Sequence, residues 1–169
     1  MKRLILMRHA KAKHGSPDGT DASRPLNKRG RGAAEAMGTF LAAQGFVPDR
    51  VLASDSARTT ETAALACAAF DPQPPTDHAG SLYLASPRTM LSMIQQADDE
   101  ADCIMMVAHN PGTADLALQM VAEGASAEVR LGLHQFPTGA VAVIDLPIDH
   151  WADAEEGRLV HYQIPSELP

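Results

Sequence analysis

Short apolar runs of strand length alternate along the chain with longer segments that carry apolar residues at helical spacing. The runs predict strands at 3–8, 50–54, 103–108, 139–146 and 159–164. Helices are expected at 28–44, 56–70 and 86–97, and from Asn110 onward. Strands that alternate with helices favour a mostly parallel sheet covered on both faces, which is a three-layer α/β/α sandwich. We expect the last strand to run antiparallel.

Residues that start and stop helices support these boundaries. Gly45 follows the first helix as a stop signal, and Pro87 stands after Ser86 at the first helical position of the third. Asn110 followed by Pro111 has the same start chemistry, so we expect Asn110 to cap the fourth helix. The glycine, proline and aspartate content from residue 11 to 25 predicts a long loop.

Composition narrows the class of protein. The 169 residues, of which 45% are hydrophobic, fit a single domain over residues 1–169. The net charge of −7 gives no support to a nucleic-acid partner. No apolar stretch reaches the length of a membrane span, and Cys67 and Cys103 fall in apolar segments without metal-site spacing. The chain is therefore expected to be cytoplasmic, with reduced core thiols and no membrane partner, and the pattern predicts no oligomeric state.

Three of the expected strands end in residues that suit phosphate chemistry. Arg8 and His9 follow the first strand, Arg58 lies just beyond the second, and His109 follows the third. Ligands in parallel α/β sheets bind beyond the carboxyl ends of the strands. If these strands are parallel, two arginines and two histidines meet in one pocket at that edge of the sheet.

The charges of these residues favour an anionic ligand. Arg58 falls in the first turn of its helix, where the helix dipole disfavours a cation by a few tenths to about 1 kcal/mol, and a bound anion reverses that penalty. The planar fork of arginine binds two phosphate oxygens at once. One neutral imidazole can attack phosphorus, while the second, cationic or hydrogen-bonding, stabilises the oxygens. This chemistry requires no metal and no cofactor.

Five segments of the chain, taken in order, resemble the SixA branch of the histidine phosphatase superfamily. They are Leu6–Lys11, Arg24–Gly30, Ser54–Ala63, Val107–Gly112 and Pro137–Ala140. The resemblance implies a phosphoglycerate mutase-like fold and a phosphatase in which His9 accepts the phosphoryl group. It further implies that Arg8, Arg58 and His109 complete the pocket and that Arg24 approaches the substrate phosphate. The superfamily's first motif usually reads Arg-His-Gly, and alanine at position 10 is common in the SixA-like branch.

A general acid is the one part of the family's machinery that the sequence does not supply. Other members place a glutamate or aspartate where this chain has the stretch 79–83, Ala-Gly-Ser-Leu-Tyr. Asp77 is the nearest carboxylate, and Asp18 or Asp21 could approach from the long loop. A phosphoramidate needs less acid catalysis than an ester, because protonation at nitrogen gives a neutral leaving group.

Three functions therefore stay open at this point. The first is a phosphatase that acts on phosphohistidine of a protein carrier. The second is a phosphomonoesterase that acts on a small phosphorylated substrate with a loop carboxylate as acid. The third is a noncatalytic phosphate-binding module, which intact histidines and arginines disfavour.

Overall fold

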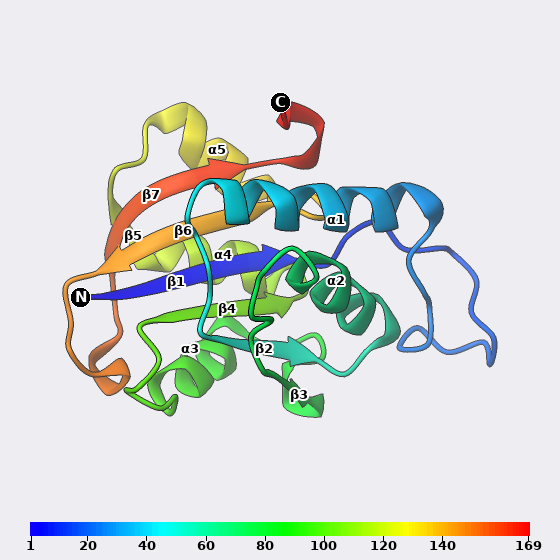
Figure 1. The fold of residues 1–169 in the computed structure, drawn as a ribbon, viewed down its shortest axis with the longest axis horizontal. Helices are drawn as coiled ribbons and strands as arrows, with labels where there is room; N and C mark the ends of the chain where they lie inside the picture. Colours follow the sequence, from blue (N-terminus) through cyan, green and yellow to red (C-terminus); the bar gives the residue numbers. More distant parts are fainter.

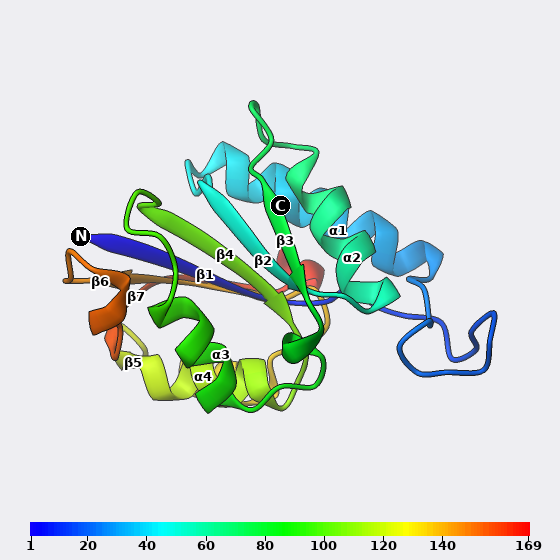
Figure 2. The same ribbon diagram turned by 90° about the horizontal axis from the view of Figure 1, so that it is seen from below.

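A seven-stranded sheet with helices on both faces forms the centre of the molecule (Figures 1 and 2) in the computed structural model, which describes residues 1–169. The strands are β1 (Lys2–Arg8), β2 (Arg50–Ser54), β3 (Thr76–Ala79), β4 (Cys103–Ala108), β5 (Val121–Glu123), β6 (Val141–Leu146) and β7 (Gly157–Gln163). The helices are α1 (Lys28–Ala43), α2 (Ala57–Cys67), α3 (Pro87–Gln95), α4 (Gly112–Met120) and α5 (Ala127–Gln135). The strand order β3-β2-β4-β1-β6-β7-β5 and the two helical layers confirm the predicted sandwich.

Alternate side chains of the central strand supply the two cores. Leu4 and Leu6 of β1 pack in the core beneath α3, α4 and α5, whereas Ile5 and Met7 pack in the core beneath α1 and α2. All four are fully buried. Successive strand residues point to opposite faces, so a strand covered on both faces reads as a continuous apolar run. This is why the first and third predicted strands stand out in the sequence.

The strand that runs against the others is β6, not the last one. It pairs antiparallel with both β1 and β7, and the remaining strands all share one direction. The chain reaches the carboxyl edge of the sheet through α5 and turns at 137–139, so the next strand has to leave from that edge (Figure 1). The expectation for the final strand was therefore wrong in direction, although β7 does pair antiparallel with its neighbour β6.

Three elements are absent from the sequence-based prediction. The edge strand β3 has the sequence Thr-Asp-His-Ala with no buried residue, and β5 is only three residues long. Helix α5 buries Leu133 alone completely, so its apolar periodicity is weak. Short or half-exposed elements leave little hydrophobic pattern to detect.

The predicted cap of α4 is also wrong. The helix begins at Gly112 with Pro111 in the cap position, and no side chain caps it. The amide of Asn110 instead donates to the carbonyl oxygen of Phe136 at 3.1 Å. Asn110 therefore ties the start of α4 to the turn that precedes β6.

Two expectations about composition can be compared with the structure. Cys67 and Cys103 are free and buried, and burial raises their pKa values to about 11 and about 12. None of the helices combines the length and the hydropathy needed to cross a lipid bilayer.

Gly38 permits the close approach of α1 to α2. A Cβ at this position would lie 2.2 Å from the backbone oxygen of Ala66, so Gly38→Ala must push the two helices apart. We expect this change to lower the free energy of unfolding by about 2 kcal/mol, as overpacking does. Gly32→Ala in the same helix is the control, because nothing lies within 4 Å and alanine favours a helix by up to about 1 kcal/mol. Urea denaturation of both variants measures the difference, and equal stabilities would contradict this account of the packing.

Candidate active site

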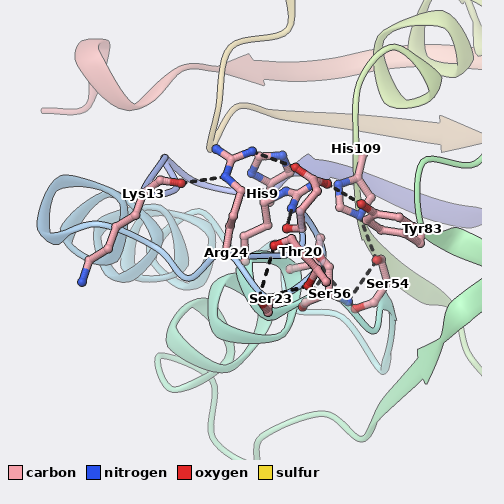
Figure 3. A network of polar contacts seen from close by, with 12 residues as sticks. His9, Lys13, Thr20, Ser23, Arg24, Ser54, Ser56, Tyr83 and His109 are labelled. Carbon is pink, nitrogen blue, oxygen red and sulfur yellow. Dashed lines mark hydrogen bonds and ion pairs between the residues drawn. The ribbon is translucent and has the colours of Figure 1, made fainter. Parts of the chain in front are cut away.

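The carboxyl ends of three adjacent parallel strands carry the predicted site residues. β4 lies between β2 and β1, and the register pairs Arg8 with Ala108. His9 and His109 therefore leave neighbouring strands side by side, with ring centroids 5.2 Å apart (Figure 3). Arg58 lies at the second residue of α2, directly after β2, and is only 4% exposed. The structure thus brings both histidines to the edge of the sheet where Arg8 and Arg58 also lie.

His9 presents an unprotonated Nε2. Its Nδ1 lies 2.8 Å from the carbonyl oxygen of Ala10, and because a carbonyl can only accept, Nδ1 must carry the hydrogen. Burial, which leaves the residue 8% exposed, and then the nearby His109, Arg58 and Arg8 lower the pKa of His9 to about 3. The ring is neutral at pH 7 and can act as a nucleophile through Nε2.

Ser54 contacts Nε2 of His109, the ring nitrogen that is left free in His9. The Ser54 hydroxyl lies 2.8 Å from Nε2 of His109 and accepts the backbone N–H of Ser56 at 3.3 Å (Figure 3). We assign the hydroxyl's own hydrogen to Nε2, an arrangement in which Nδ1 carries the proton of the ring. That Nδ1 is buried without a hydrogen-bond partner. Burial, followed by the charge of Arg58, lowers the pKa of His109 to about 4, so the ring is neutral at pH 7.

The two arginines leave donors that an anion would satisfy. Arg8 donates through Nη1 to the carbonyl oxygen of Phe136 at 3.1 Å, while its Nε is buried without a partner. Burial and the charge of Arg58 lower the pKa of Arg8. Unpaired buried donors cost free energy, and two guanidinium groups close together repel each other. A bound phosphoryl group would remove both penalties.

Asp21, in the long loop, accepts hydrogen bonds from several donors at the site. Its carboxylate accepts from Arg58 at 2.9 Å, from Arg24 at 2.9 Å and from the hydroxyl of Tyr83, and its backbone oxygen accepts from Arg58 at 2.8 Å. Tyr83 also stands edge-on to His109, with ring centroids 5.4 Å apart. These donors, Tyr83 first, lower the pKa of Asp21, so it remains a carboxylate. Asp21 thereby ties the long loop to Arg58.

Arg24 joins this network from the loop itself. Its Nε donates to the carbonyl oxygen of Lys13 at 2.7 Å, and its Nη1 makes the bond to Asp21 (Figure 3). Arg24 and Arg58 therefore bind the same carboxylate, that of Asp21. The three-residue spacing from Asp21 to Arg24 was visible in the sequence, but nothing there indicated that Tyr83 would reach the same group.

The other two candidate acids point elsewhere. Asp77 accepts from Nε of Arg50 at 2.7 Å and lines a hollow against Met93 and Gln96 of the α3 region. Asp18 accepts from the backbone N–H of Thr20 at 2.9 Å within its own loop. Of the three carboxylates, Asp21 alone contacts the arginines and the tyrosine at the site.

The two imidazoles are expected to show the same tautomer at neutral pH, with different partners at Nε2. Nitrogen-15 correlation spectra should find the hydrogen on Nδ1 in both rings, with Nε2 bonded to Ser54 only in His109. Because burial lowers both pKa values, both rings should stay neutral down to pH 5, and His109 should protonate before His9 below that. The unfolded chain takes up these protons near pH 6.5, so the free energy of unfolding should fall as the pH drops below that value. Ser54→Ala should change the His109 spectrum alone, and a titration of either ring near pH 6.5 would contradict the assignment.

Comparisons with known proteins agree on one family. Residues 4–80 match the model of the histidine phosphatase superfamily (branch 1). Uncharacterized protein Rv1276c of Mycobacterium tuberculosis is 36% identical over 164 residues, which is 94% of this chain and 99% of that protein. This relative extends the match well beyond the segment that the family model covers.

Solved structures named as SixA phosphohistidine phosphatases have the same fold. The structure from Nakamurella multipartitia has a TM-score of 0.84 and 26% identity, over 97% of this chain and 96% of that one. The structure from Agrobacterium tumefaciens has a TM-score of 0.78 and 28% identity, over 97% and 98%. A mycobacterial glucosyl-3-phosphoglycerate phosphatase shares the fold at 14% identity, with a TM-score of 0.62 over 94% of this chain and 97% of that one. On this sequence and structural similarity, the chain belongs to the histidine phosphatase superfamily and resembles its SixA-like members.

Proposed function

We propose that this chain is a phosphohistidine phosphatase that removes the phosphoryl group from a histidine of another protein. In the first step Nε2 of His9 attacks phosphorus, the new N–P bond forms and the N–P bond of the substrate breaks. The departing imidazole is neutral because its phosphorylated form takes a proton from solvent. Water then attacks phosphorus on His9, which releases inorganic phosphate and restores the neutral ring.

The donors around His9 support transfer of a phosphoryl group. Nδ1 of His109 and Nε of Arg8 are buried donors without partners. The guanidinium of Arg58 has donors left beyond its two bonds to Asp21. Charge on the oxygens of a transferring phosphoryl group is stabilised by such fixed donors. The site therefore suits a phosphoryl group flanked by a nucleophile on one side and a leaving group on the other.

The choice of substrate rests on the partners and the ionisation of the three candidate acids. Asp77 pairs with Arg50, Asp18 binds its own loop, and Asp21 is kept ionised by three donors. An ionised carboxylate cannot protonate a leaving alkoxide, whereas a phosphoramidate departs as a neutral imidazole. The site is thus better matched to phosphohistidine than to a phosphate ester.

A substrate panel tests the proposal. Purified protein is incubated with a phosphohistidine peptide, a phosphoserine peptide of the same sequence and glycerol phosphate, and the release of phosphate is followed. We expect kcat/KM for the phosphohistidine peptide to exceed the other two by about 10²-fold, the usual size of a general-acid contribution that esters would lack. Faster hydrolysis of either ester would overturn the proposal.

The small-molecule alternative would have to use Asp21 as its acid, since no other loop carboxylate contacts the site. Asp21→Asn then separates the two functions. If Asp21 protonates an ester leaving group, this change abolishes ester hydrolysis. Any residual activity should no longer fall as the pH rises, because no general acid is left to lose its proton. Asp77→Asn serves as the control, because its partner Arg50 lies outside the site.

A further inference from the structure

Positive charge is concentrated in one stretch of this acidic chain. Residues 1–31 contain nine of the 14 lysines and arginines but only two of the 21 acidic residues. The other 138 residues hold the remaining five basic residues and 19 acidic ones. The net charge of −7 therefore combines a strongly basic segment with a strongly acidic remainder.

The fold places exposed basic side chains of this segment around the carboxyl edge of the sheet. Lys11 follows His9 by two residues, and Lys28 and Arg29 open α1 at the same end of the molecule (Figure 1). Lys13, whose backbone binds Arg24, extends away from the site (Figure 3). We call these four exposed residues, Lys11, Lys13, Lys28 and Arg29, the basic rim. None of them takes part in any of the ion pairs of the structure.

A hollow lies between the basic rim and the turn that precedes β6. Lys11 and Arg29 line a pocket of about 250 Å³ together with Pro137 and Thr138. The next residue, Gly139, donates its backbone N–H to the carbonyl oxygen of His9 at 3.0 Å. Unpaired cations therefore line a hollow next to the turn whose backbone contacts His9.

The opposite end of the sheet is acidic. The turn before β4 and the connection from β6 to β7 lie where the strands β1, β2 and β4 begin, away from His9 (Figures 1 and 2). Their exposed acidic residues are Asp98, Asp99, Glu100, Asp102, Asp149, Asp153, Glu155 and Glu156. Opposite charges at the two ends of the strands give the molecule a charge asymmetry that points its catalytic edge toward negative partners.

We propose that the basic rim docks an acidic surface that surrounds the phosphohistidine of a partner protein. This inference rests on the proposed function and names the surface of its substrate. A long polyanion such as a nucleic acid would run past the rim and meet the acidic remainder of the chain. A protein domain carries a patch of limited extent, so its negative charge can match the rim and avoid the opposite end.

Two synthetic peptides test the proposal. Each has 12 residues with a central phosphohistidine, flanked by glutamates in one and by lysines in the other, and free phosphoramidate serves as the small-molecule reference. At low salt we expect kcat/KM for the glutamate peptide to exceed that for the lysine peptide by about tenfold or more. The ratio should fall toward one in 0.5 M salt, where the Debye length is only about 4 Å.

Charge-reversal variants test whether the preference for the glutamate peptide comes from the basic rim. Arg29→Glu and Lys28→Glu should each reduce the glutamate-to-lysine ratio several-fold. Arg158→Glu is the matched control: Arg158 is exposed in β7, makes no hydrogen bond through its side chain, and lies near the acidic end. An equal effect of Arg158→Glu, or a ratio within twofold of one at low salt, would overturn the proposal.

Further measurements separate this proposal from the proposed function and from nucleic-acid binding. Fluorescence anisotropy with unphosphorylated forms of the two peptides reports docking even if neither phosphopeptide is hydrolysed. Tighter binding of the glutamate peptide, weakened by Arg29→Glu, is the expected result. Stronger inhibition by a 20-nucleotide oligothymidylate than by the glutamate peptide would instead identify a nucleic-acid surface and reject an acidic protein.

Discussion

Replacement of His9 by alanine is expected to abolish formation of the phosphoenzyme and to reduce turnover of phosphohistidine peptide by about 10⁴-fold or more. His9 is the imidazole whose Nδ1 is occupied by a backbone carbonyl and whose Nε2 carries no hydrogen. His109 cannot replace it as nucleophile, because its Nε2 is engaged by Ser54 and its Nδ1 bears the hydrogen. Rapid acid-free quenching followed by phosphorus-31 spectroscopy measures the phosphoenzyme directly.

The control for this experiment is His14→Ala. His14 is exposed in the long loop, belongs to the same residue type and contacts neither arginine of the site. It should retain both the phosphoenzyme and turnover within a few-fold. Circular dichroism of His9→Ala checks that loss of a buried ring has not unfolded the protein, and a phosphorylated His9→Ala protein would overturn the assignment of the nucleophile.

Sequence alone could predict the centre of the fold because the central strands are buried on both faces. The runs at β1 and β4 are continuous and apolar, and each is followed at once by a residue of the site. Parallel strands that begin at one edge end at the other, so Arg8–His9 and His109 had to lie together once the two strands were neighbours. The position of these residues follows from pattern and connectivity.

The periphery could not be predicted in the same way. The direction of β6 depends on α5, whose single fully buried residue leaves almost no helical signal. The cap of α4 was misassigned because Asn110 has a more distant partner, the carbonyl oxygen of Phe136, than local capping rules consider. In both cases a contact between segments far apart in sequence decided the structure.

The same limit applies to the site. Asp21 and Tyr83 are 62 residues apart, and no periodicity connects a loop aspartate to a tyrosine after β3. The sequence offered Asp77 as the nearest candidate acid, with Asp18 or Asp21 from the long loop as the others. Only the fold distinguishes the one that contacts Arg58 from the two that bind elsewhere.

Arg58→Ala is expected to lower kcat for phosphohistidine peptide by about 10²-fold or more, as loss of a fixed charge contact to the transition state does. Arg58→Lys should recover only part of this loss, since an ammonium group cannot bind Asp21 and a phosphoryl oxygen with the planar fork of a guanidinium. Both the backbone oxygen and the carboxylate of Asp21 accept from this fork, so the variants also release the loop.

Asp21→Asn distinguishes a direct contact of Arg58 with the phosphoryl group from a role of Arg58 in holding the loop. It leaves the bond from Arg58 to the backbone oxygen of Asp21 in place, while it removes the charge of the carboxylate and replaces one of its two acceptor oxygens by a donor. If Arg58 acts directly on the phosphoryl group, Asp21→Asn should cost much less in kcat than Arg58→Ala, about tenfold or less. Equal losses in the two variants, or a loss below tenfold in Arg58→Ala, would mean that Arg58 holds the loop and does not contact the transferring group.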